Sequence, residues 1–149
     1  MTVSLDPRDY VGKGQDGVWE VDLEARLRTE PEVQRAEFLS QVLALQERSR
    51  KGKGLWFRLA KSLLTTSPSY DRLLRASLAV ADASSIKVWL ECCVQRMGMR
   101  GVLSVLRAED ATHPQRVDLT TYWLPRLART PKEQAAVKIF MGTRATSKR

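Results

Sequence analysis

The residues of this sequence best suited to covalent or metal chemistry are two cysteines and a histidine. Cys92 and Cys93 are adjacent, and His113 is the only histidine. A cysteine nucleophile needs a positively charged, partly exposed setting with a base nearby, and a structural zinc site needs a larger set of Cys and His ligands. Adjacent cysteines also rarely form an unstrained disulfide. We therefore expect Cys93 to pack in a core, and we predict no catalytic residue and no metal site.

The carboxylates do not form a catalytic pattern either. Those of the N-terminal third alternate with basic residues, as on a solvated helix face: Glu20, Asp22, Glu24, Glu30 and Glu32. General acid–base catalysis would need two carboxylates at helical spacing within an apolar pattern, and no such pair is found. His113 directly precedes Pro114, which places it in a turn. The sequence thus predicts a protein that is not an enzyme and needs no cofactor.

Binding chemistry is better represented, in the stretch SRKGKGLWFRLAK at residues 49–61, which has five positive charges and no acid. Backbone amides in SRKGKG can hold an anion before a helix N-terminus, although the glycine spacing is not that of a Walker motif. Helical periodicity places Trp56 in a core and leaves Phe57 outside the apolar stripe. The candidate binding residues for an anionic partner are Arg48, Arg50, Lys51, Lys53, Phe57, Arg58 and Lys61. The alternative is a core helix with a solvated cationic side.

Length and composition indicate a globular protein. A chain of 149 residues is expected to form one domain. No apolar run approaches the roughly 18 residues that span a bilayer, and the opening MTVSLDPRDY is not a secretory signal. Without a disulfide framework, we expect an intracellular location, in the cytoplasm or, in a eukaryote, the nucleus.

The net charge of +8 is unevenly distributed. Residues 1–50 contain 7 Lys and Arg against 10 Asp and Glu, whereas residues 51–149 contain 18 against 7. Such asymmetry fits a basic face that meets an acidic partner, or an acidic part that packs over a basic part of the same molecule.

The elements that must position these residues are helices. Periodicity predicts an all-α fold of about six to eight short antiparallel helices, including residues 18–28, 30–48, 55–64, 67–81, 86–97 and 131–141. Capping boxes are predicted at Thr29–Glu32 and at Thr130–Glu133. The sequence predicts an extended or flexible lead-in at residues 1–17, a single all-α domain at 18–142, and a disordered basic tail at 143–149.

The segment GMRGVLSVLRAEDATHPQRVDLTTYWLPRLA, residues 98–128, resembles the central part of an armadillo repeat. It contains a glycine turn, a short Val-Leu helix, a polar turn and a helix that ends with Trp123, Leu124, Leu127 and Ala128. Residues 85–97 and 130–142 resemble the flanking helices, the second of them closed by Gly142. Pro125 departs from the family pattern and predicts a kink, and no asparagine ladder is present. The resemblance implies an armadillo-like stack with a concave partner surface; the alternative is an irregular helical bundle.

Three functions fit these patterns. The first is a non-enzymatic interaction module that binds an acidic protein partner. The second is sequence-nonspecific nucleic-acid binding through residues 48–61, Arg72, Arg75, Arg100, Arg107 and the basic tail. The third is association with an anionic membrane through the helix at 55–64, with Trp56 and Phe57 inserted. A second copy of the chain is a further candidate partner, because a short repeat stack leaves its end faces exposed.

Overall fold

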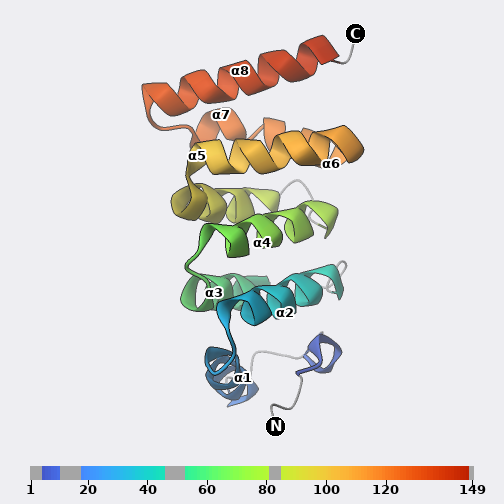
Figure 1. The fold of residues 1–149 in the computed structure, drawn as a ribbon, viewed down its shortest axis with the longest axis vertical. Helices are drawn as coiled ribbons and strands as arrows, with labels where there is room; N and C mark the ends of the chain where they lie inside the picture. The colour runs from blue at the N-terminus through green and yellow to red at the C-terminus, as the bar shows by residue number, and fades with distance from the viewer. Residues whose placement is uncertain (1–4, 11–17, 46–52, 81–84, 148–149) are drawn as a thin grey trace. The chain divides into compact units, whose positions relative to one another are not determined.

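The computed structural model describes residues 5–10, 18–45, 53–80 and 85–147, and all of its regular structure is helical (Figure 1). A short 3-10 helix, η1 (Pro7–Asp9), precedes eight α-helices, and the described residues contain no strand. The prediction of an all-α fold is therefore confirmed.

The chain forms two compact units, unit 1 (Met1–Val80) and unit 2 (Ala81–Arg149). The single domain at residues 18–142 stays a prediction, and the two units are described separately. Amphipathic periodicity reports that each helix has a buried face, but it does not report which helices share a core. The end of the helix predicted at residues 67–81 and most of the connection to the helix predicted at 86–97 lie in residues 81–84, outside the described residues.

Unit 1 contains η1, α1 (Val18–Arg28), α2 (Glu32–Leu45), α3 (Lys53–Leu63) and α4 (Ser67–Val80). Helix α2 packs against η1, α3 and α4, and α1 packs against α3. The apolar stripe predicted for α3 is buried at Trp56, Leu59, Ala60, Leu63 and Leu64. Helix α4 buries its predicted face at Tyr70, Leu73, Leu74 and Leu78.

Of the lead-in predicted to be extended or flexible, the structure describes residues 5–10, and this part contains the 3-10 helix η1. Pro7 is buried, and the ring of Tyr10 lies 5.8 Å from that of Trp19 and 5.9 Å from that of Phe38. Aromatic contacts between residues distant in sequence anchor this segment, and local glycine content gives no sign of them.

The first turn of α2 connects two loops, the one between α1 and α2 and the one between α3 and α4, through Glu32 and Arg35. The predicted capping box is wrong, because the Thr29 hydroxyl donates to the Arg26 carbonyl and the Glu32 carboxylate accepts from Thr65, Thr66 and Ser69 before and within α4. The Arg35 guanidinium donates to four backbone carbonyl oxygens: those of Leu27, Arg28, Glu30 and Leu63. These contacts satisfy carbonyls at the ends of α1 and α3, which have no partner within their helices, and the Thr65 and Thr66 amides directly before α4.

Unit 2 contains α5 (Ile86–Thr112), α6 (Pro114–Thr121), α7 (Leu124–Leu127) and α8 (Pro131–Ser147). Helix α5 packs against α6 and α8, and α7 packs against α6 and α8. Gly98 interrupts α5 with a φ of 80° and a ψ of 160°, at the position where the sequence predicts a helix end. The helix expected to kink at Pro125 is divided into α6 and α7 by a turn at Tyr122 and Trp123.

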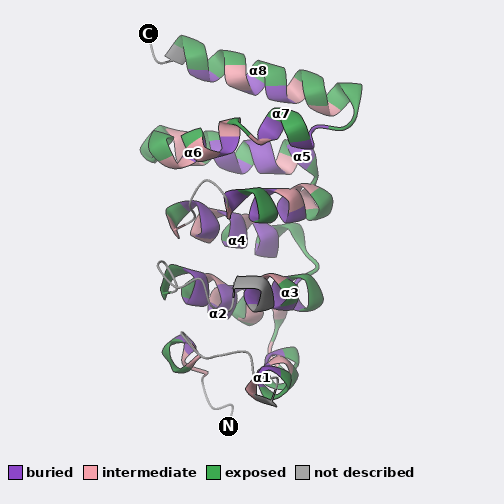
Figure 2. Ribbon diagram, turned by 180° about the vertical axis from the view of Figure 1, so that it is seen from behind, coloured by how far each residue is buried: buried purple, intermediate pink, exposed green. Residues whose placement is uncertain are grey.

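Helix α8 starts with the second predicted capping box, which is confirmed. The Glu133 amide donates to the Thr130 hydroxyl at 3.1 Å, and the Glu133 carboxylate accepts from the Thr130 amide at 3.1 Å. The prediction that Gly142 closes this helix and that residues 143–149 are a disordered tail is wrong as far as Ser147, because α8 continues to that residue. Figure 2 shows buried residues on the side of α8 that faces the rest of unit 2 and exposed residues on its other side.

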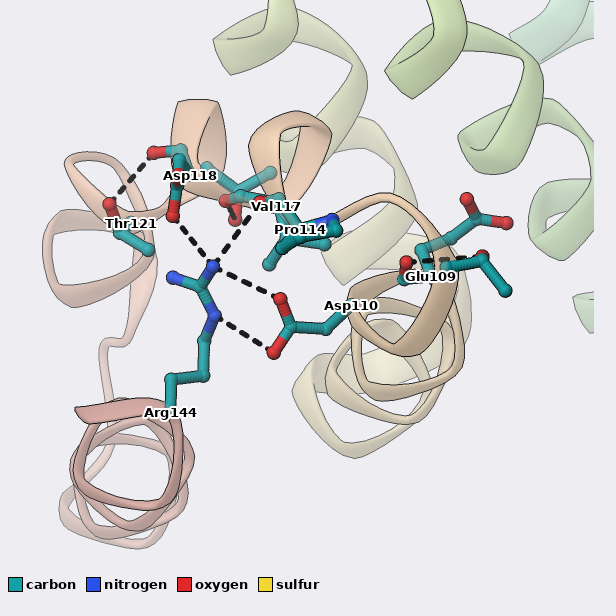
Figure 3. A network of polar contacts seen from close by, with 9 residues as sticks. Glu109, Asp110, Pro114, Val117, Asp118, Thr121 and Arg144 are labelled. Carbon is teal, nitrogen blue, oxygen red and sulfur yellow. Dashed lines mark hydrogen bonds and ion pairs between the residues drawn. The ribbon is translucent and has the colours of Figure 1, made fainter. Parts of the chain in front are cut away.

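Arg144 explains why α8 continues beyond Gly142. Its side chain is 8% exposed, and its guanidinium contacts Asp110 at 3.1 Å and Asp118 at 2.6 Å (Figure 3). It also donates to the Pro114 carbonyl at 3.3 Å. Burial opposes ionisation of this guanidinium, but the hydrogen bonds to Asp110 and Asp118 raise the pKa of Arg144 above its ordinary value. The end of α8 is thereby held to α5 and α6.

Candidate functional site

The structure describes the predicted basic site only in part. Arg48, Arg50 and Lys51 lie outside the described residues. Lys53 is the first residue of α3, but the position of its side chain is not described. Of the predicted set, the structure describes the side chains of Phe57, Arg58 and Lys61.

Those three residues lie on the outer side of α3. Arg58 forms an ion pair with Glu20 of α1, with 3.1 Å between Nη2 and Oε2. Phe57 is half-buried, and the Lys61 ammonium lies 5.4 Å from its ring centroid. The ring that the sequence leaves outside the stripe is thus partly covered by Lys61, and the charge of Arg58 is partly neutralised.

Trp56 is not available for membrane insertion in this fold. Its side chain is 1% exposed, and its ring lies 6.1 Å from that of Trp19. Inserting Trp56 into a bilayer would require α3 to leave its core position, which removes the driving force for an interfacial anchor.

In unit 2 the described carboxylates all have contacts within the unit. Asp110 and Asp118 contact the buried Arg144, and Glu133 caps α8. Glu91 lies 3.9 Å from Arg129, and Glu109 lies 3.6 Å from the ring of His113. The backbone amides of Thr130 and Arg129 lower the pKa of Glu133 below its ordinary value, so this side chain stays ionised while its charge faces the helix N-terminus.

The cations of unit 2 are mostly exposed, and several rest on aromatic rings. The Arg126 guanidinium lies 3.8 Å from the Tyr122 ring centroid, and the Lys87 ammonium lies 5.2 Å from that of Trp123. Arg107 lies 5.9 Å from the ring of Phe140. A ring face orients a cation but does not neutralise its charge. Eight Lys and Arg residues of the unit are exposed: Lys87, Arg96, Arg100, Arg107, Arg126, Arg129, Lys132 and Lys138.

A groove lies between the Gly98 turn and the start of α8. Its volume is about 460 Å³, and it is lined by Gly98, Met99, Arg100, Thr130, Lys132, Glu133, Ala135, Ala136 and Ile139. Ile139 is 64% exposed, one of the most exposed large apolar side chains in the described structure. Arg100 and Lys132 are exposed cations in the lining, and neither forms an ion pair with any described residue. We call these lining residues the Gly98 groove.

The sequence predicts the Gly98 turn but not this groove. The available signal was the position of Ile139, because an inward face with Val137, Phe140 and Arg144 leaves Ile139 on the outer side of α8. The position of Ile139 indicates a groove only once α8 is known to lie against α5.

The described residues contain no group of three or more side chains able to hold a metal ion, and Cys92 and Cys93 are both buried. Among the described helices, none is both long enough and apolar enough to cross a membrane. No protein-family model matches the chain, and neither the curated proteins nor the solved structures provide a match. The armadillo resemblance therefore stays a prediction.

Proposed function

We propose that this chain is a non-enzymatic helical interaction module that binds an acidic protein partner through unit 2. The observation that carries the proposal is the division of charge in that unit. Unit 2 contains 12 Lys and Arg against 6 Asp and Glu. Four of its described carboxylates are engaged by the buried Arg144, the N-terminus of α8 or Arg129, and Glu109 lies 3.6 Å from the His113 ring. Eight cations of the unit, Arg129 among them, are exposed.

This arrangement favours an acidic partner for a physical reason. Carboxylates held in caps and in the Arg144 cluster cannot turn toward a second molecule without loss of folding free energy. Exposed cations can, and such charges increase the association rate and select against basic partners. Exposed apolar side chains among them, Val88, Tyr122 and Ile139, supply area that a protein surface can bury.

Nucleic-acid or anionic-membrane binding through residues 48–61 is the alternative. Two observations weaken this alternative: Arg58 is paired with Glu20, and Trp56 is buried. The charge of unit 2 therefore favours a protein partner. We use it as the competing arm of the test.

The test is a binding series with the full chain and three labelled probes: a Glu-Ser copolymer, a DNA duplex of about 20 base pairs, and phosphatidylserine-containing vesicles. We expect the copolymer to bind at about 50 mM salt and more weakly at about 200 mM, because exposed charges are screened. Neutralising Arg50, Lys51 and Lys53 together should leave copolymer binding intact. Copolymer binding that disappears in this triple variant, or duplex binding alone, would contradict the proposal.

A further inference from the structure

The Gly98 groove has a feature that charge alone does not explain, namely an apolar lining. Met99 is 3% exposed, Ala135 and Ala136 are small, and Ile139 projects from α8 with most of its surface in contact with solvent. Two cations that form no ion pair with any described residue, Arg100 and Lys132, belong to the same lining. An apolar surface bordered by cations is the complement of a helix with an apolar face and acidic flanks.

We propose that the Gly98 groove is the docking site for a short amphipathic helix of the partner, with apolar side chains in the groove and acidic residues toward Arg100 and Lys132. This inference rests on the proposed function, and it specifies the site and the chemistry of the bound segment. A groove of about 460 Å³ accommodates a few side chains, as expected for a helix that uses anchors spaced by three or four residues.

The lining does not suit a small polar ligand. Small-molecule sites combine an apolar wall with a few convergent polar groups. Here Thr130 and Glu133 are already occupied by the capping box. The remaining polar groups are the long side chains of Arg100 and Lys132, which do not fix the orientation of a small molecule.

The lining also does not suit nucleic acid or a second copy of the chain. Single-stranded nucleic acid binds on aromatic platforms, and the described residues that line the groove include no aromatic one. A second copy carries the same net charge of +8 and would bring further cations to the cationic rim.

The test uses anisotropy of three labelled synthetic peptides of about 16 residues against the full chain. The first has Leu at helical spacing with Glu on the other face, the second has the same residues in an order without an apolar face, and the third has Lys in place of Glu. We expect micromolar binding of the first and at least tenfold weaker binding of the other two.

Matched variants on α8 locate the binding. Ala135 lines the groove and Ala145 does not, yet both are exposed. We expect Ala135→Trp to weaken the first peptide at least tenfold and Ala145→Trp to leave it unchanged. Lys132→Glu should weaken it and Lys138→Glu, on the same helix outside the groove, should have a smaller effect. If Ala135→Trp does not fold, Ile139→Ser tests the same surface from an exposed position.

The outcomes separate the two proposals. Equal binding of the first and second peptides, or binding that survives both Ala135→Trp and Ile139→Ser, would overturn the groove while leaving an acidic partner in place. Equal binding of the Lys peptide would overturn the acidic flanks. Absence of binding by every acidic probe, including the Glu-Ser copolymer, would overturn both proposals.

Discussion

At the scale of single residues, Glu32 shows how the same carboxylate can serve a different helix from the one predicted. Thr29 and Glu32 have the spacing of a capping box, but Glu32 caps α4 instead of its own helix. Partial burial opposes ionisation, yet the hydrogen bonds from Thr66, Thr65 and Ser69 and from the Thr65 amide lower the pKa of Glu32 to about 2. Ionised Glu32 therefore stabilises the folded state.

Replacing Glu32 tests this role. Glu32→Gln should destabilise the protein by about 1–2 kcal/mol at pH 7, the usual range for a lost cap. Because the folded pKa is below the ordinary value of 4.5, the Glu32 contribution is complete above pH 4.5 and is lost as pH falls toward about 2. The difference between the two proteins, measured by urea unfolding, should thus shrink over that interval. Glu30→Gln, two residues earlier in the connection between α1 and α2, is the control and should change stability by less than about 0.5 kcal/mol; an equal effect of both variants would contradict the assignment.

At the scale of elements, two glycines of unit 2 behave differently: α5 is interrupted at Gly98, whereas α8 continues through Gly142. Gly98 takes a backbone conformation that only glycine adopts readily, and this residue divides α5 beside the groove. Gly142, by contrast, lies within a continuous helix where nothing requires glycine. The two glycines look equally suited to end a helix in the sequence, but Arg144 extends α8 past Gly142 by joining it to Asp110 and Asp118.

Alanine substitutions at these two glycines should change the stability of the protein in opposite directions. At Gly98 an added Cβ meets no atom within 4 Å, so Gly98→Ala should cost about 1–3 kcal/mol through backbone strain alone. Gly142→Ala also meets open space, and it should stabilise α8 by about 0.5–1 kcal/mol because it reduces the freedom of the unfolded chain. Thermal melts followed by circular dichroism measure both. Stabilisation by Gly98→Ala would show that the α5 interruption is not fixed by glycine.

At the scale of the whole molecule, the positive charge belongs mainly to unit 2. Unit 1 contains 13 Lys and Arg against 11 Asp and Glu, so its net charge is +2, compared with +6 for unit 2. The basic stretch at residues 49–61 is thus part of a nearly balanced unit. A run of cations in the sequence indicates a binding face less well than the net charge that a unit keeps after its internal ion pairs have formed.

Removing equal charge from each unit tests whether the basic stretch at residues 49–61 or the exposed cations of unit 2 bind the acidic probe. The double variant Arg100→Gln with Lys132→Gln should weaken binding of the Glu-Ser copolymer about three- to tenfold at about 50 mM salt. The double variant Arg58→Gln with Lys61→Gln removes the same charge from unit 1 and should change it by less than about twofold, since Arg58 already contacts Glu20. Titration by anisotropy gives both constants. Equal losses would indicate that net charge, and not its location, governs binding.

The sequence by itself determined the helices and their buried faces. Stripes such as Trp56, Leu59 and Leu63 repeat at the helical period, and burial of such a stripe is required wherever the helix packs. The second capping box is equally local, because its hydrogen bonds join Thr130 and Glu133 to each other and to the neighbouring Arg129 amide. Interactions confined to a few neighbouring residues can be predicted from the local sequence, because every participant lies within it.

Only the tertiary structure decided which helices form a unit, which helix Glu32 caps, and where α8 ends. Each of these outcomes depends on residues about 30 or more positions apart, as with Glu32 and Thr65 or Arg144 and Asp110. The Gly98 groove has the same origin, since Met99 and Ile139 belong to different helices. A polar or exposed side chain has many chemically suitable partners in a sequence of this length, and packing selects among them because burial requires each polar group to be satisfied.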